Sequence, residues 1–200
     1  MSIHTWSIAL AEHICGELNN QKGGPSKAVV AYGLEIIIEA LIKIIAFILV
    51  PFALGILKPF LIAYFTAGIL KLSSGGYHCS AYYRCLITTL LVFSAIAFLA
   101  IYLPQNIPAF EITVASLLIA LVVFIKLVPV DVPEKPIISA KRRKVLRILS
   151  MLKLIALFMV LVIYQPGHDV MLAICLSVLF HVFTLTMPGR GLLNWLDNII

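Results

Sequence analysis

The stretch IIIEALIKIIAFILVPFALGIL, residues 36–57, decides the class of fold. Its only charged residues are Glu39 and Lys43, and almost every other side chain is apolar. About 20 consecutive, predominantly apolar residues are enough for a helix to cross the roughly 30 Å hydrocarbon core of a bilayer. The stretch therefore predicts a membrane-spanning helix.

The composition extends this interpretation to the whole chain. Of the 200 residues, 62% are hydrophobic and 12% are charged, whereas a soluble domain is about half apolar and a quarter charged. The net charge of +6 would suit a nucleic-acid partner, but most basic residues flank hydrophobic runs, as in membrane proteins. We therefore predict an all-α polytopic membrane protein that binds no nucleic acid.

Proline, glycine and charged residues divide the chain into six predicted spans within a single membrane domain, residues 1–200. The spans are 34–57, 58–72, 86–103, 110–128, 148–164 and 170–187. Ahead of them, within residues 1–22, apolar residues recur at spacings of three and four, which predicts an amphipathic helix. Because its apolar face is only a stripe, we expect this helix to lie in the headgroup plane.

The basic residues between the spans predict the orientation of the chain. Eleven of them fall on one side and one, Lys58, on the other; the eleven are Lys22, Lys27, Lys71, Arg84, Lys135, Lys141, Arg142, Arg143, Lys144, Arg147 and Arg190. Cytoplasmic connections carry the excess of Lys and Arg. Both termini and the connecting segments 73–85 and 129–147 are therefore predicted to be cytoplasmic.

Residues 73–85, SSGGYHCSAYYRC, contain the residues best suited to chemistry. Cys85 is a candidate nucleophile and His78 a candidate base, because a thiol needs a base to become a good nucleophile. Seven residues of straight helix would separate the two by about 10.5 Å, so the pair requires an irregular segment at His78. Gly75 and Gly76 favour one. The alternative is an interfacial histidine and a buried, inert cysteine.

Other residues of this region leave open questions. Cys79 is a second candidate thiol, although neighbours in sequence point in different directions on a helix. Cys15 and Cys175 lie in apolar patterns typical of packing residues, and the cysteine spacings predict no metal site. No acidic residue lies near 73–85 in sequence, so a third catalytic group is not identified. Backbone N–H groups around Gly75 and Gly76 could hold an oxyanion.

The pattern Lys71-x3-Gly75-Gly76-x-His78-x6-Cys85 resembles the accessory gene regulator B (AgrB) family of membrane cysteine endopeptidases. The proline-rich segment 129–136 with its following basic run is similar to a cytoplasmic loop of that family, and the chain length and span count agree. Lys71 stands where we expect the family to favour arginine, which binds carboxylates more rigidly.

The resemblance implies a function at the cell membrane of a Gram-positive bacterium, without a cofactor. Cys85 would attack a peptide bond of a quorum-sensing propeptide, with His78 as base and then acid. A cysteine or serine of the peptide would then displace Cys85 and close a thiolactone or lactone ring. The implied partners are a propeptide with an amphipathic segment and an acidic C-terminal tail, membrane lipid, and a second copy of the chain in a homodimer.

The densest basic cluster consists of Lys141, Arg142, Arg143, Lys144 and Arg147. It is interpreted first as a topology signal. The alternative is a binding role, in which Lys71, Lys141, Arg142 and Arg143 attract the acidic tail of the propeptide, or the cluster attracts anionic lipid.

A small membrane transporter is the competing function. Glu35, Glu39 and Lys43 follow one another at i,i+4 spacing and, with His78, could line a polar path. Paired repeats or broken spans are typical of transporters, and we find none in the sequence.

Overall fold

The computed structural model describes residues 3–18, 26–77, 79–131 and 136–199, so His78, Lys22 and Lys135 lie outside the described residues. Eight helices make up nearly all of the described chain, which confirms the all-α prediction. In order they are α1 (Ile3–Leu18), α2 (Lys27–Ala53), α3 (Leu57–Ser74), α4 (Tyr82–Tyr102), α5 (Ala109–Leu127), α6 (Ala140–Tyr164), α7 (His168–Leu185) and α8 (Met187–Ile199).

Five of these helices are long and apolar enough to cross a membrane, namely α2, α4, α5, α6 and α7. The chain is therefore a polytopic membrane protein. The second predicted span, 58–72, coincides with α3, but α3 is not one of the five. Its 18 residues include Lys58 and Lys71, and it ends with two serines.

Two helices begin earlier than predicted, and one helix was missed. α2 begins at Lys27 rather than at residue 34, and α6 begins at Ala140 rather than at residue 148. Hydropathy marks only the apolar part of a helix, whereas Ser139 caps α6 by accepting a 3.4 Å hydrogen bond from the Arg142 N–H. The basic cluster thus lies on the first turns of α6 instead of in a loop. The sequence interpretation ended at residue 187 and contained no counterpart of α8.

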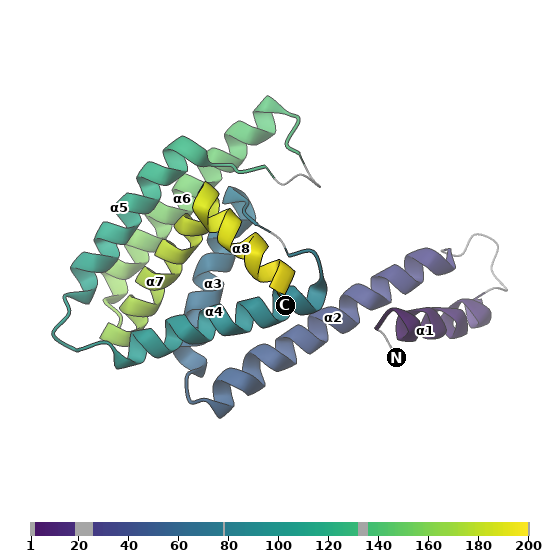
Figure 1. Ribbon diagram of the computed structural model, residues 1–200. Helices are drawn as coiled ribbons and strands as arrows, with labels where there is room; N and C mark the ends of the chain where they lie inside the picture. The colour runs from purple at the N-terminus through teal and green to yellow at the C-terminus, as the bar shows by residue number, and fades with distance from the viewer. Residues whose placement is uncertain (1–2, 19–25, 78, 132–135, 200) are drawn as a thin grey trace. The chain divides into compact units, whose positions relative to one another are not determined.

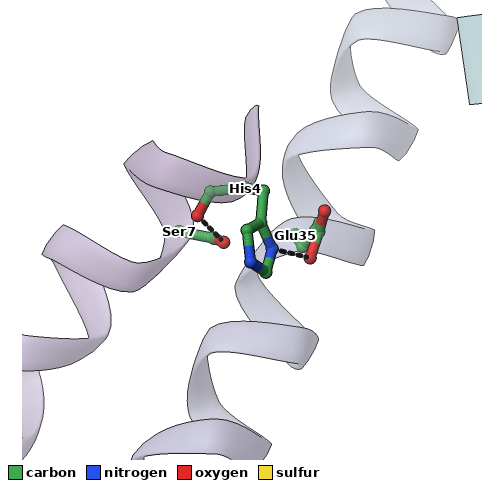
Figure 2. A network of polar contacts seen from close by, with 3 residues as sticks. All are labelled: His4, Ser7 and Glu35. Carbon is green, nitrogen blue, oxygen red and sulfur yellow. Dashed lines mark hydrogen bonds and ion pairs between the residues drawn. The ribbon is translucent and has the colours of Figure 1, made fainter. Parts of the chain in front are cut away.

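The chain divides into two compact units, of which the first is Met1–Val50. Here α1 confirms the helix predicted within residues 1–22, and Trp6 and Leu10 of its apolar stripe are exposed. Figure 2 shows His4 Nδ1 at 3.2 Å from the Glu35 carboxylate, while the Ser7 hydroxyl donates to the His4 carbonyl oxygen at 2.9 Å. Lys27 and Glu12 form a second ion pair. These contacts connect α1 with α2.

The second unit, Pro51–Ile200, is a helical bundle built around α7. α7 contacts α3, α4, α5 and α8, and two thirds of its apolar stretch is buried. α5 also packs on α6 (Figure 1). The core combines side chains of the four helices α3, α5, α6 and α7, among them Leu70, Phe124, Leu154, Val178 and Leu185.

Buried hydroxyl groups between the helices of this unit bond to backbone carbonyls or to one another. Ser177 Oγ donates to the Ala63 carbonyl oxygen at 2.6 Å, and Thr113 Oγ1 to that of Met171 at 3.1 Å. Within a membrane, small polar residues at helix contacts allow close approach and satisfy each other's hydrogen bonds. The bundle therefore fixes the ends of α3, α4 and α7, where the candidate site lies.

Candidate functional site

The turn after α3 depends on Gly75. This residue has φ 79°, and its N–H donates to the Lys71 carbonyl oxygen at 3.0 Å. The Val130 N–H donates to the Ser74 carbonyl oxygen at 2.9 Å, and a Cβ on Gly75 would lie 2.3 Å from the Val130 oxygen. Only glycine fits this close approach at a positive φ. The Gly75 N–H is already engaged, so the predicted oxyanion role of the glycines stays a prediction.

Cys85 is the fourth residue of α4, at the predicted place near the start of the third span. Its N–H donates to the Ala81 carbonyl oxygen at 3.1 Å, and its Sγ lies 3.9 Å from Thr89 Oγ1. The described residues on both sides of position 78, residues 75–77 and 79–81, lie outside helices, as the pair requires. The distance between His78 and Cys85 stays a prediction, because His78 is outside the described residues.

Cys79, the competing thiol, lies in an environment that disfavours the thiolate. Burial, followed by the neighbouring Cys85 sulfur and the Asp197 carboxylate, raises the pKa of Cys79 to about 11. Because the thiolate is the nucleophile, Cys79 is almost entirely in its unreactive protonated form near pH 7. This environment disfavours Cys79 as the nucleophile.

Two contacts fix Tyr77, the residue before position 78. Lys71 Nζ donates to the Tyr77 carbonyl oxygen at 2.6 Å, and the Tyr77 hydroxyl donates to Asp197 Oδ2 at 3.1 Å. Burial and the Asp197 hydrogen bond raise the pKa of Tyr77 to about 12. Its hydroxyl therefore remains a neutral donor at physiological pH. Lys71, predicted as a substrate-binding residue, in this structure binds the backbone of the connection.

Asp197 of α8 is the residue that the sequence analysis missed. It is 4% exposed, and its Oδ2 also accepts the Ser80 N–H at 3.0 Å. The Ser80 hydrogen bond is the main reason why the pKa of Asp197 lies below its usual value. Arg84 donates to the Asp197 backbone oxygen. The only sequence signal was the helical spacing of apolar residues in 187–199, which could have revealed α8 but not its contacts.

A cavity of about 100 Å³ lies between α3, α4, α7 and α8. Its lining includes Lys71, Tyr77, Thr89, Phe93, Phe180 and His181. Thr89 is the same residue that contacts the Cys85 sulfur. Among the residues that the structure describes, no group of three His, Cys, Asp or Glu side chains could hold a metal ion. The cavity can admit a small, mainly apolar side chain, and Thr89 in its lining is one helical turn from the thiol.

His181 forms a second polar contact that the sequence analysis missed. It is 3% exposed, and its Nε2 lies 2.8 Å from the hydroxyl oxygen of buried Ser74. The histidine sits in a hydrophobic run, where no local pattern distinguishes a functional from a packing role. The contact joins the last turn of α3 to α7.

The basic cluster divides into structural and exposed members. Arg143 pairs with Asp131, and Arg147 Nε donates to the Val128 carbonyl oxygen at 2.8 Å. Both arginines thereby attach residues 128–131, which also contact Gly75, to α6. Lys141 and Arg142 are exposed. With exposed Lys144, they are the members of the cluster for which no side-chain contact to the rest of the described chain is seen, so they are accessible to a partner.

These observations define a polytopic membrane protein with an accessible thiol beside a fixed, glycine-dependent connection. The family model described as accessory gene regulator B matches residues 7–185. The chain therefore belongs to the AgrB family, which comprises peptidases that process quorum-sensing peptides.

Two relatives from Clostridium perfringens are described as AgrB-like proteins. The one from strain SM101 is 31% identical and the one from strain 13 is 30% identical, each over 215 aligned positions. Both alignments cover 98% of this chain and 97% of the relative. No solved structure matches the chain at a significant level.

Proposed function

We propose that this protein is a membrane cysteine endopeptidase in which Cys85 is the nucleophile and His78 the base. The substrate is a quorum-sensing propeptide with an amphipathic segment and an acidic C-terminal tail. The observation that carries the proposal is the position of Cys85 at the start of α4, beside a connection that Lys71 and Asp197 hold in place. The high pKa of Cys79 argues against the competing thiol as the nucleophile.

The reaction consists of two acyl transfers. His78 takes the proton from the Cys85 thiol, the sulfur attacks the scissile carbonyl carbon, and a tetrahedral intermediate forms. The C–N bond then breaks, and His78 returns the proton to the leaving amine, which releases the C-terminal part of the propeptide. A cysteine or serine of the retained part attacks the thioester, the C–S bond to Cys85 breaks, and the thiol regains a proton.

Ring closure competes with hydrolysis of the thioester. Exchange of one thioester for another is nearly thermoneutral, so water must be kept away until the internal nucleophile attacks. Enclosure of a reactive intermediate suppresses such side reactions. The small cavity lined by Thr89, Phe93 and Phe180 supports this role because it offers apolar surface one helical turn from Cys85.

We further propose that α3 is a sixth span. Ser150 Oγ donates to Ser73 Oγ at 2.9 Å and Lys153 Nζ to the Ile69 carbonyl oxygen at 2.7 Å, so α3 and α6 run antiparallel. The Ser177–Ala63 and Ser74–His181 contacts make α3 and α7 parallel. In a six-span protein the second span is antiparallel to the fifth and parallel to the sixth. Here the fifth and sixth spans are α6 and α7, and α3 has the required direction relative to both.

The charges support a cytoplasmic site. Residues 71–85, residues 128–131, the first turns of α6 and α8 together form what we call the site end of the second unit. It carries Lys71, Arg84, the basic cluster and Arg190, and the excess of basic residues lies on the cytoplasmic side. Cations at a helix N-terminus oppose the helix dipole. Exposed Lys141 and Arg142 at the start of α6 are thus well placed to attract an acidic tail.

The test is co-expression with a propeptide that carries an amphipathic segment, a central cysteine and an acidic tail. Mass spectrometry should detect the released C-terminal fragment and a peptide whose mass fits ring closure. We expect no product with Cys85→Ala or with His78→Ala, since each removes one partner of the proton transfer. Cys79→Ala is the matched control and should retain most of the activity.

A second peptide tests the covalent step. Replacing its central cysteine by alanine removes the internal nucleophile, so the thioester on Cys85 should accumulate and be released by hydroxylamine. Cleavage that survives Cys85→Ala, or that is lost only in Cys79→Ala, would contradict the assignment.

A further inference from the structure

The cavity between α3, α4, α7 and α8 changes from polar to apolar along α4. One face of that helix carries Cys85, Thr88 and Thr89, because side chains three and four positions apart are neighbours on a helix. Thr88 and Thr89 line the cavity, and Thr89 Oγ1 lies 3.9 Å from the Cys85 sulfur. One turn further along, the lining continues with Val92 and Phe93. The wall therefore begins one turn from the thiol with hydroxyl groups and continues with apolar side chains.

Apolar side chains of the other helices complete the cavity. Its lining includes Ala67 of α3, Phe180 of α7 and Leu193 of α8. Ala67 is 7% exposed and Leu193 is 8% exposed, so both side chains are packed inside the unit. Leu193 also brings α8 into the wall, and α8 lies beyond residues 7–185 that match the family model. The shape of the cavity thus depends on the C-terminal helix of this chain.

The hydroxyl group of Thr88 points to an occupant with polar atoms. Thr88 is 8% exposed, and its Oγ1 is buried without a hydrogen-bond partner in the part of the chain that the structure describes. A buried hydroxyl group without a partner is costly, and it can both donate and accept. A peptide residue combines a polar backbone with a side chain in the order that this wall offers, whereas a lipid acyl chain has no polar atoms for the hydroxyl groups.

The volume of the cavity limits the side chain that fits. An apolar cavity of about 150 Å³ holds benzene, whereas this cavity measures about 100 Å³. It therefore suits an aliphatic side chain, such as that of leucine or methionine, and is too small for an aromatic ring.

We propose that this cavity binds the side chain of the propeptide residue whose carbonyl carbon Cys85 attacks, and that Ala67 and Leu193 limit the size of that side chain. The inference rests on the proposed function and adds its specificity-determining pocket. The peptide backbone lies at the end of the cavity that carries Thr88 and Thr89, and the side chain occupies the apolar interior. The bound residue is aliphatic, and it supplies the carbonyl group of the thiolactone or lactone.

The first experiment varies the propeptide and uses the full-length, unmodified protein in detergent. The mass of the released fragment identifies the scissile bond and hence the residue before it. Propeptides with leucine, alanine or phenylalanine at this position are then compared by kcat/KM. One methylene group in a hydrophobic pocket changes kcat/KM by about 10- to 200-fold, so we expect the leucine peptide to exceed the alanine peptide at least about tenfold. The phenylalanine peptide should also be cleaved more slowly than the leucine peptide.

Two variants then change the size of the cavity in opposite directions. Ala67→Val adds methyl groups to the wall and should lower the leucine-to-alanine ratio of kcat/KM about tenfold. Leu193→Ala enlarges the cavity and should raise the phenylalanine-to-leucine ratio by about the same factor. Gly68→Val is the matched control, because a Cβ at the neighbouring Gly68 meets nothing within 4 Å. It should leave both ratios unchanged.

The ratio of two peptides measured on one preparation does not depend on the folded fraction, so general damage to the protein does not imitate the expected result. Equal kcat/KM for the leucine and alanine peptides with the unmodified protein would overturn the proposal, even if a variant failed to fold. So would ratios that Ala67→Val and Leu193→Ala leave unchanged, or that Gly68→Val changes equally. Absence of cleavage by the unmodified protein, or cleavage that survives Cys85→Ala, would instead refute the proposed function and with it this inference.

Discussion

The two ends of the second unit use different means to join their helices. At the far end, short connections at residues 103–108 and 165–167 join α4 to α5 and α6 to α7, with His168 Nε2 at 3.2 Å from the Ile107 carbonyl oxygen. At the site end, buried Ser74, His181 and Asp197 contact segments more than 100 positions away. Closing a turn does not require such contacts. At the site end these contacts hold side chains of different helices in fixed positions around the connection.

Glycine substitutions should show the largest difference in stability between the two ends. Gly75→Ala places a Cβ 2.3 Å from the Val130 oxygen at φ 79°, so we expect a loss of at least about 2 kcal/mol in unfolding free energy, together with loss of cleavage. Gly167→Ala at the far end meets only the Asp169 side chain at 3.3 Å and should cost less than about 1 kcal/mol. Unfolding curves in detergent measure both. Equal effects would show that the two ends are equally tolerant.

Buried hydroxyl groups allow a finer comparison. Ser74→Ala leaves the buried His181 Nε2 without its partner and should cost about 1–3 kcal/mol. Thr113→Val, nearer the far end, removes hydrogen bonds to the carbonyls of Ala109 and Met171, which retain their helical partners, and should cost about 1 kcal/mol or less. The measurement is again the unfolding free energy. A larger loss for Thr113→Val than for Ser74→Ala would contradict the idea that buried hydroxyl groups stabilise the site end more than the far end.

Charge substitutions should separate substrate binding from stability. Replacing exposed Lys141 and Arg142 together by Gln should raise KM for the propeptide about three- to tenfold, because each cation near a membrane surface attracts anionic groups by about 1 kcal/mol before screening. Membrane insertion and kcat should be unchanged. Lys58→Gln, at the other end of the bundle, is the matched control. Failure of the double variant to insert would instead identify a topology signal.

The smallest expected effect concerns acid stability. The native pKa of Asp197 is lowered, so its ionised form stabilises the folded protein above the unfolded-state pKa of about 4. This contribution is lost as the pH falls through the lower native pKa. The melting temperature of the unmodified protein should therefore exceed that of Asp197→Asn at pH 6, and the difference should narrow below pH 4. A difference in melting temperature that does not change with pH would exclude this link between the ionisation of Asp197 and stability.

Much of the architecture could be predicted from the sequence, because apolar runs and their polar boundaries are local signals. They placed Cys85 correctly in the first turns of α4 and indicated α1 from its apolar stripe. They failed at the start of α6, because the charges of residues 141–147 end the apolar run without ending the helix.

The contacts of Asp197 with the connection could not be predicted for a different reason. A search for an acid near 73–85 looks along the chain, whereas Asp197 lies 117 positions after Ser80 and reaches it only through the packing of α7 and α8. Likewise, nothing local distinguishes His181 within its hydrophobic run. Hydropathy locates the helices along the chain, but it does not show which helix ends contact one another.

The Ser74–His181 contact has a consequence for the timing of biosynthesis. The last turn of α3 leaves the ribosome 107 residues before its partner on α7. A nascent chain that has inserted only its early helices therefore carries the thiol without the surroundings that fix it. If the proposed function holds, activity should appear only after α7 has inserted and packed on α3, which protects unfinished chains from premature acylation.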